Sequence, residues 1–309
     1  MSVKKFEGLD ADESIFFQRE LMAKKAKTYD ILYPELRARS LFPISKEAGP
    51  GATSIQYEQH DMVGMAKIIS SYADDLPRAD IKGKEFISPV KSLGDSYGYN
   101  IQEIRSAKMA GKPLEQKRAN SAKRAMLYQE NQIALLGDTN TGLPGFLSNA
   151  NVPLVVLAAD GTGATTTFST KTPDQIIRDL NKVVNSILSV SKGVEVADTV
   201  LLPIDQYTLI STTARSSNSD TTILEYFKKN NPMIKEVSWL NELDGAGAGG
   251  TDRMVVYTRN PDKLTMEVPQ DFEQFPAQAK GLEFVIPCHM RVGGVIMYYP
   301  LSAAFADGI

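Results

Sequence analysis

The chain has 309 residues, of which 42% are hydrophobic and 23% charged, and a formal net charge of -3, which is the composition of a globular protein. No apolar run is long enough to cross a bilayer, and the charged N-terminus lacks the apolar core of a secretory signal. The single cysteine, Cys288, excludes an intrachain disulfide framework. The near-neutral net charge gives no support for a dedicated nucleic-acid-binding surface, but it is compatible with a shell that surrounds nucleic acid.

Residues 1–50 are predicted to form an N-terminal arm. A short helix is expected over about residues 13–27, and repeated prolines then interrupt regular structure, at Pro34, Pro43 and Pro50. Segments with so little apolar surface do not fold alone. The arm therefore either lies against another body or is a poorly ordered terminus.

A long two-stranded excursion is predicted over residues 51–100. Ile55 and Tyr57 alternate with polar residues, and a second strand-like run covers residues 86–90. The polar stretch between them carries turn-forming residues, namely Asp74, Asp75, Pro77 and Gly83. Because an isolated hairpin is marginally stable in water, this one must pack on its own domain or on a neighbouring molecule.

A long helix is predicted over residues 113–136, with Gly137 as its left-handed C-terminal cap. Apolar residues recur at three- and four-residue spacing and form one stripe, made of Leu114, Ala119, Ala122, Met126, Ile133 and Leu136. On periodicity alone, a core helix of an α/β enzyme explains this pattern equally well.

A compact α/β subdomain is predicted over about residues 173–258. Its first helix covers residues 173–190 with Thr172 as cap, and its inner face consists of Ile176, Ile177, Leu180, Val183, Val184, Ile187 and Leu188. Strands at 199–202, 237–240 and 253–258 alternate with helices at 203–210 and 221–229.

The remaining strands are predicted on either side of this subdomain. Residues 154–158 form a candidate buried strand, and further strands are expected at 263–268, 282–286 and 291–300. Gly293 and Gly294 mark a bulge or a close backbone approach. The last of these strands is expected to pair beside residues 154–158.

One glycine-rich loop formally matches a dinucleotide-binding motif, with Gly245, Gly247 and Gly250 at the required spacing. That motif requires a following helix, whose N-terminus binds the phosphates. A strand is predicted here instead, so a flexible loop between two strands is the better interpretation.

No catalytic or metal-binding constellation is evident. Cys288 and His289 are adjacent on a predicted strand and would point to opposite faces, and His60 is isolated. Asp74 and Asp75 are expected to be solvated charges at a loop tip. The sequence therefore predicts a protein that is not an enzyme and that has no cofactor and no metal.

Taken in order, these elements resemble the HK97-like major capsid proteins of tailed bacteriophages and the related encapsulin shell proteins. The resemblance covers about residues 76–147. It includes the aromatic entry Gly98–Tyr99, a short helix over residues 101–110, the junction at 111–113, the helix end at Glu130–Asn131, and the step over 142–146.

The resemblance implies an α+β, HK97-like fold. Residues 1–50 would be the N-terminal arm, 51–100 the extended β loop (E-loop), 101–160 the spine helix with the first part of the peripheral domain, 161–260 the axial domain, and 261–309 the C-terminal strands of the peripheral domain. The implied function is structural: copies self-assemble as pentamers and hexamers into an icosahedral virion shell around double-stranded DNA, in the host cytoplasm. An encapsulin-like compartment and an α/β enzyme are the alternatives.

Inter-subunit contacts are expected at the loop tip and near the symmetry axes, through Lys82, Lys84, Asp74, Asp75, Gly245, Gly247, Gly249 and Gly250. Portal and decoration proteins are further implied partners, and a membrane is not. Some shells of this kind crosslink a loop lysine to an asparagine of a neighbour. Here the residues with suitable chemistry are Lys67, Lys82 and Lys84 with Asn149 or Asn151.

Overall fold

The computed structural model describes residues 33–63, 80–111, 114–216, 218 and 220–309. The chain divides by contacts into Met1–Glu35 and a body, Leu36–Ile309. The helix predicted at residues 13–27 lies outside the described residues. Among the helices that the structure describes, none combines the length and apolar character needed to span a membrane.

The arm prediction extends too far along the chain, because residues 36–45 belong to the body. This segment forms α1 (Ala38–Leu41) and β1 (Ile44–Ser45). Ala38, Leu41 and Phe42 are buried in a core that they share with α3. Pro43 lies between these two elements, and the segment packs on the body despite it.

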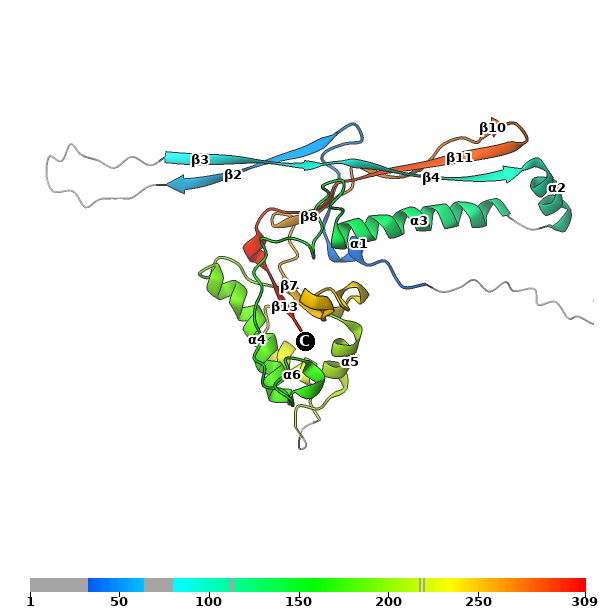
Figure 1. Ribbon diagram of the computed structural model, residues 1–309. Coiled ribbons are helices and arrows are strands. Elements are labelled where there is room, and N and C mark those ends of the chain that lie inside the picture. Colours follow the sequence, from blue (N-terminus) through cyan, green and yellow to red (C-terminus); the bar gives the residue numbers. More distant parts are fainter. Residues whose placement is uncertain (1–32, 64–79, 112–113, 217, 219) are drawn as a thin grey trace, which may run out of the picture. The chain divides into compact units, whose positions relative to one another are not determined.

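An antiparallel hairpin is present within the predicted excursion, but residues 91–100 are not part of it, because they form a separate strand that pairs with residues 283–292. β2 (Ser54–Val63) and β3 (Asp80–Pro89) pair so that Ser54 lies opposite Pro89 and Val63 opposite Asp80. The two strands form a sheet of their own (Figure 1). The connection, residues 64–79, lies outside the described residues.

The long helix packs on one face of a four-stranded sheet, and we call the two together the long-helix layer (Figure 1). The helix is α3 (Leu114–Leu136), and the strands are β4 (Lys91–Asn100), β9 (Gln270–Gln274), β10 (Gln278–Lys280) and β11 (Glu283–Val292). Ala122, Met126 and Ile133 of α3 are buried against the sheet. The side chains that they meet belong to β4 and β11, namely Tyr97, Tyr99, Ile286, Cys288, Met290 and Val292.

The ends of the helices follow from local sequence. α2 (Ile101–Ala110) begins with a capping box between Asn100 and Glu103 and ends at the left-handed Gly111. α3 ends at Gly137, whose φ is 76°, as predicted. Leu136 was wrongly placed in the apolar stripe, since it is exposed, while its neighbour Leu135 is buried.

The predicted α/β subdomain is present, and we call it the α/β layer. Its helices are α4 (Pro173–Val190), α5 (Ile204–Thr212) and α6 (Ile223–Asn230), preceded by the 3-10 turn η1 (Phe168–Thr170). Its predicted strands are β5 (Thr199–Leu202), β6 (Glu236–Trp239) and β7 (Arg253–Tyr257). Thr172 and Gln175 form a capping box at α4. The predicted inner face of α4 is buried except for Leu188, which is exposed.

A fourth strand of this sheet was not predicted. β13 (Ala303–Asp307), which follows the 3-10 turn η4 (Pro300–Ser302), pairs antiparallel with β7 and gives the order β13-β7-β5-β6. Residues 303–307 were expected among the C-terminal strands of the peripheral domain. Their ladder partner is instead in the α/β layer.

The pairing predicted for residues 291–300 is wrong. β12 (Gly294–Met297) pairs with β8 (Leu264–Glu267), whose other neighbour is β1. At the bulge, Gly294 has a φ of 75°, and a Cβ there would lie 2.2 Å from the Pro144 oxygen, so a close backbone approach is confirmed.

Residues 154–158 do not form a buried strand. Leu154 makes one isolated bridge with Phe305, and the side chains of Leu154 and Val156 are 53% and 77% exposed. Only the alternate residues Val155 and Leu157 pack on the core. The apolar run therefore follows β13 as an extended segment with one face left open.

A shared core joins the two layers. Phe146 contacts the rings of Phe42 and Tyr257, with centroid distances of 4.8 and 5.1 Å. The buried Tyr257 hydroxyl donates a hydrogen bond of 2.9 Å to the Leu41 oxygen, and burial raises its pKa. Because α1, α3 and β7 all contribute side chains here, both layers pack on one continuous hydrophobic cluster.

Candidate inter-subunit surfaces

The outer half of the β2–β3 hairpin is exposed on this chain. Lys82 lies opposite Asp61 and Lys84 opposite Gln59 in the ladder, and both lysines are exposed. Met62 and Ile81 form a pair near the end of the described strands and are 85% and 65% exposed. Asp74 and Asp75 lie outside the described residues. The hairpin thus presents both lysines beside an apolar pair that the described part of the chain leaves uncovered.

The root of the hairpin is fixed to the body by aromatic contacts. The Tyr57 ring stacks on Phe86 with a centroid distance of 5.1 Å and meets Tyr298 edge-on at 5.0 Å. Gln59 donates a hydrogen bond from Nε2 to the backbone carbonyl oxygen of Tyr298, and the Lys84 ammonium lies 4.7 Å from the Phe86 ring centroid. These contacts orient the two strands where they leave the body.

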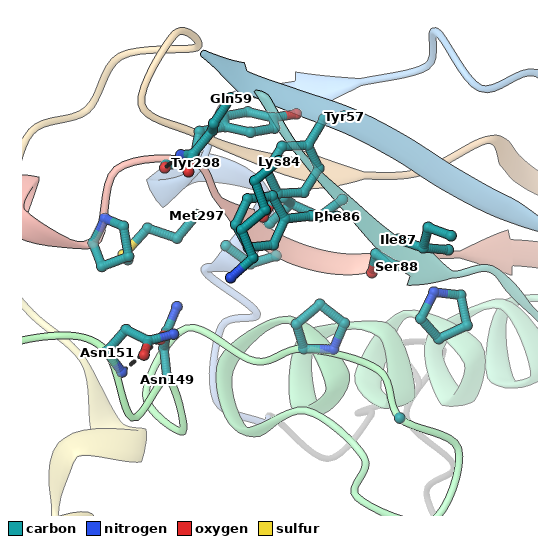
Figure 2. Close-up of a pocket in the computed structure, with 16 residues that line it drawn as sticks. Tyr57, Gln59, Lys84, Phe86, Ile87, Ser88, Asn149, Asn151, Met297 and Tyr298 are labelled. Carbon is teal, nitrogen blue, oxygen red and sulfur yellow. Dashed lines mark hydrogen bonds between the residues drawn. The ribbon is translucent and has the colours of Figure 1, made fainter. Parts of the chain in front are cut away.

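A groove of about 470 Å³ lies between this root and the body (Figure 2). It is lined from the hairpin by Lys84 and Ser88 and from the facing loop by Asn149 and Asn151. The backbone N–H of Asn151 donates a 3.0 Å hydrogen bond to Asn149 Oδ1, whereas the buried Ser88 hydroxyl has no hydrogen-bond partner among the described residues. The fold therefore brings the predicted Lys84 to the same groove as both predicted asparagines, while Lys67 lies outside the described residues.

The glycine-rich loop lies between β6 and β7, as predicted, and includes the 3-10 turns η2 (Asn241–Leu243) and η3 (Ala248–Gly250). Gly245, Gly249 and Gly250 have positive φ values of 66°, 71° and 77°. A Cβ on Gly247 would lie 2.7 Å from the Thr251 oxygen. The loop needs these glycines for its backbone path.

Carboxylates hold this loop in place. Asp307 of β13 accepts a 2.9 Å hydrogen bond from the Ala248 amide and one of 2.6 Å from Arg253 Nε. Burial alone would raise the pKa of Asp307, but the bonds from Arg253 and the Ala248 amide lower it below its usual range. The contact with Asp252 and its charge raise the pKa of Asp244. In this loop, the charge of Asp307 is neutralised by Arg253, whereas Asp244 lies against a second carboxyl group, that of Asp252.

The histidines, cysteine and glycine motif that the sequence raised as candidates for chemistry can now be placed. Within the described residues, no group of three or more histidine, cysteine, aspartate or glutamate side chains is arranged to hold a metal ion. Cys288 is buried, and burial raises the pKa of its thiol. The glycine motif is followed by β7 and not by a helix, which removes the phosphate-binding geometry.

Sequence reasoning missed the residues that position these surfaces. Tyr298 holds the hairpin root and lies more than 200 residues from Tyr57, so no local pattern links the two. The Arg253–Asp307 pair likewise joins β7 to a strand that was not predicted. The alternation of Tyr57 with polar residues was a usable signal, because it predicts a strand with one covered face, although it does not say what covers that face.

Known proteins with this arrangement are capsid proteins. A family model described as "Major capsid protein" matches residues 64–309. The capsid of the Myoviridae phage XM1 superposes with a TM-score of 0.83 at 16% identity, over 96% of this chain and 99% of that chain. The capsid of an empty GTA particle gives a TM-score of 0.62 at 11% identity, over 94% and 95% of the two chains.

A virus-like particle from Pyrococcus furiosus gives a lower TM-score of 0.52 at 12% identity, over 86% of this chain and 90% of that chain. The search of curated proteins gives no match. At these identities the structural likenesses show the fold, which is HK97-like, and the family model supplies the function. The chain belongs to the major capsid protein family of tailed bacteriophages and is a shell-forming structural protein of the virion.

Proposed function

We propose that copies of this chain assemble as pentamers and hexamers into an icosahedral shell that encloses double-stranded DNA and is built in the host cytoplasm. The observation that carries this proposal is the exposed outer half of the β2–β3 hairpin. A two-stranded sheet has too little packed surface to be stable alone in water. A neighbouring subunit that covers Met62 and Ile81 would supply the missing apolar contact.

In this assembly the hairpin lies over a neighbour, and the glycine-rich loop lies near the fivefold and sixfold axes. Lys82 and Lys84 would meet the neighbour from the hairpin, with Asp74 and Asp75 at its tip. Gly245, Gly247, Gly249 and Gly250 would let loops from several copies approach closely. The exposure of both lysines and the positive φ of three of these glycines support this placement.

The shell is proposed to be non-catalytic, and its partners are further copies with portal and decoration proteins. The buried Cys288 and the lack of a metal-ligating group among the described residues give the enzyme alternative no support. The encapsulin alternative differs in its cargo. Membership of the major capsid protein family favours DNA.

A covalent bond between subunits remains a hypothesis. Lys84 lines one groove with Asn149 and Asn151. A neighbouring subunit that entered this groove would bring its own lysine or asparagine side chains close to these three residues. Denatured particles that give only monomer-sized chains in mass spectrometry would reject the crosslink without affecting the shell.

The shell proposal is tested by giving the exposed hairpin a charge. Met62→Glu with Ile81→Glu should leave the folded subunit intact, because exposed substitutions change stability by about 0.5 kcal/mol or less. The variant should form no particles in negative-stain microscopy. Val194→Glu, at a site 76% exposed in the α/β layer, is the matched control and should still assemble. Normal shells from the hairpin variant would contradict the proposal.

A further inference from the structure

One face of α3 carries positive charge and lies opposite its buried stripe. At about 100° per residue, Lys117 and Arg124 lie two turns apart on the side away from Ala122 and Met126. The exposed side chains around them, with Lys123 at the edge nearer the buried stripe, form what we call the cationic face of α3, made of Lys117, Asn120, Ser121, Lys123, Arg124 and Tyr128. None of these six residues is acidic.

This charge is local, because the chain as a whole is negative. Residues 101–136 contain seven lysines and arginines against three glutamates, whereas the whole chain has a net charge of -3. Two of the three glutamates are held by arginines. Glu130 is buried and paired with Arg39, and Glu103 pairs with Arg118 at 3.0 Å. Residues 101–136 therefore carry four more positive than negative side chains in the sequence.

We propose that the cationic face of α3 contacts the phosphates of the enclosed DNA; this inference rests on the proposed function. Lysine and arginine neutralise phosphates, and amide and hydroxyl groups such as those of Asn120 and Ser121 donate hydrogen bonds to them. Lys117 and Arg124 lie about 10 Å apart along the helix axis at 1.5 Å per residue. A row of cations fits a line of phosphates better than it fits a small anion, which requires convergent donors.

The opposite face of the long-helix layer carries charges of both signs. On the open side of the sheet, Glu283 of β11 lies opposite Lys280 of β10, and His289 lies opposite Glu273 of β9. Arg291 of β11 is on the same side as His289, two residues away. This mixture suits phosphates less well than the cationic face of α3, whose six residues include no acidic side chain.

Few contacts per copy also suit a container. For each phosphate contact, log K falls with log salt with a slope of about −0.9. Each contact therefore strengthens binding roughly eightfold when the salt concentration falls from 1 M to 0.1 M. Two or three contacts bind weakly in one subunit but are repeated in every copy. DNA is then held in general, without preference for sequence and without tight binding at any one point.

The test measures binding of the full chain, kept as single subunits by Met62→Glu with Ile81→Glu, to a random-sequence DNA duplex by fluorescence anisotropy over a series of salt concentrations. Lys123→Gln with Arg124→Gln should lower the salt slope by about 2 and weaken binding correspondingly. Lys228→Gln with Lys229→Gln removes the same charge from exposed positions on α6 and should leave the slope unchanged. All four positions are exposed on helices, so thermal melts should be alike.

An unchanged slope in the Lys123/Arg124 variant would overturn the assignment, as would an equal loss in the α6 control. Polyaspartate that bound this face more tightly than the duplex would assign it to an acidic protein segment instead. Electron microscopy of the same charge variants with the native hairpin reports separately on the shell. Shells with an unchanged slope reject only the α3 contact, and a lowered slope without shells rejects only the shell.

Discussion

Arg39 and Glu130 form a bidentate ion pair, in which the Nε–Oε2 and Nη2–Oε1 distances are both 2.8 Å. Glu130 is buried in the C-terminal half of α3, and Arg39 also meets Asp271 of β9 at 3.0 Å. Beside this pair, Asn131 Oδ1 accepts a 3.0 Å hydrogen bond from the Ala38 amide. The segment through which the chain enters the body is therefore bound to α3 by both charge and hydrogen bonds.

Arg39→Ala should destabilise the subunit by about 3 kcal/mol, because it leaves the Glu130 carboxylate buried without its cation. Arg259→Ala is the control, since Arg259 pairs with Glu236 at 3.5 Å on the surface and should cost about 1 kcal/mol or less. Urea unfolding of both variants measures the difference. Equal losses would show that burial of Glu130 does not set the strength of its pair.

Tyr57→Ala should loosen the hairpin root, because it removes the ring contacts with Phe86 and Tyr298. Each aromatic pair contributes about 1 kcal/mol beyond its buried area. Amide hydrogen exchange should therefore accelerate along β2 and β3 while α4 keeps its protection. Tyr57→Phe retains both ring contacts and should exchange as the wild type does. Faster exchange in the phenylalanine variant would assign the effect to the hydroxyl.

Gly294→Ala should cost about 3 kcal/mol or more, from about 1–2 for the left-handed backbone and about 1–3 for overpacking against Pro144. Gly281 separates these two effects, because its φ is also positive, at 66°, but a Cβ there would meet nothing within 4 Å. Gly281→Ala should thus show only the backbone cost. Thermal unfolding of the two variants is the measurement, and similar losses would remove the steric part of the explanation.

Asp244→Asn should flatten the dependence of stability on pH. Asp252 raises the pKa of Asp244 above its ordinary 3.8, so the folded protein keeps a proton that the unfolded chain has released. That contribution to stability is complete below about pH 4 and is lost as the pH rises through the raised pKa. The asparagine can hydrogen-bond to Asp252 without a charge, so its melting temperature should fall less over this range. Parallel curves for the two proteins would contradict the shared proton.

Elements with local signals were predicted well. α4 has its capping residues and its apolar face within one stretch of sequence, and Gly137 supplies the end of α3 in the same way. The failures depend on distant partners. Residues 154–158 have the composition of a buried strand, but the position of β13 leaves one of their faces open.

The candidate surfaces show the same difference between features that are local in the sequence and features that depend on distant partners. The chemistry of Lys84, Asn149 and Asn151 was visible in the sequence, and so was the glycine-rich loop. The groove that the three residues share arises from packing between the hairpin and a loop more than 60 residues away, which no spacing rule predicts. The proposed contacts of the two lysines and four glycines with a neighbouring subunit stay predictions.

The place of β13 has a consequence for how the subunit is made. Until residues 303–307 leave the ribosome, β7 is the edge of its sheet and its backbone groups on that side lack their ladder partners. An unpaired edge invites another chain to add a strand. During synthesis the chain therefore passes through a stage at which it could aggregate with other copies. A chaperone that bound the chain at that stage would protect it until β13 paired with β7.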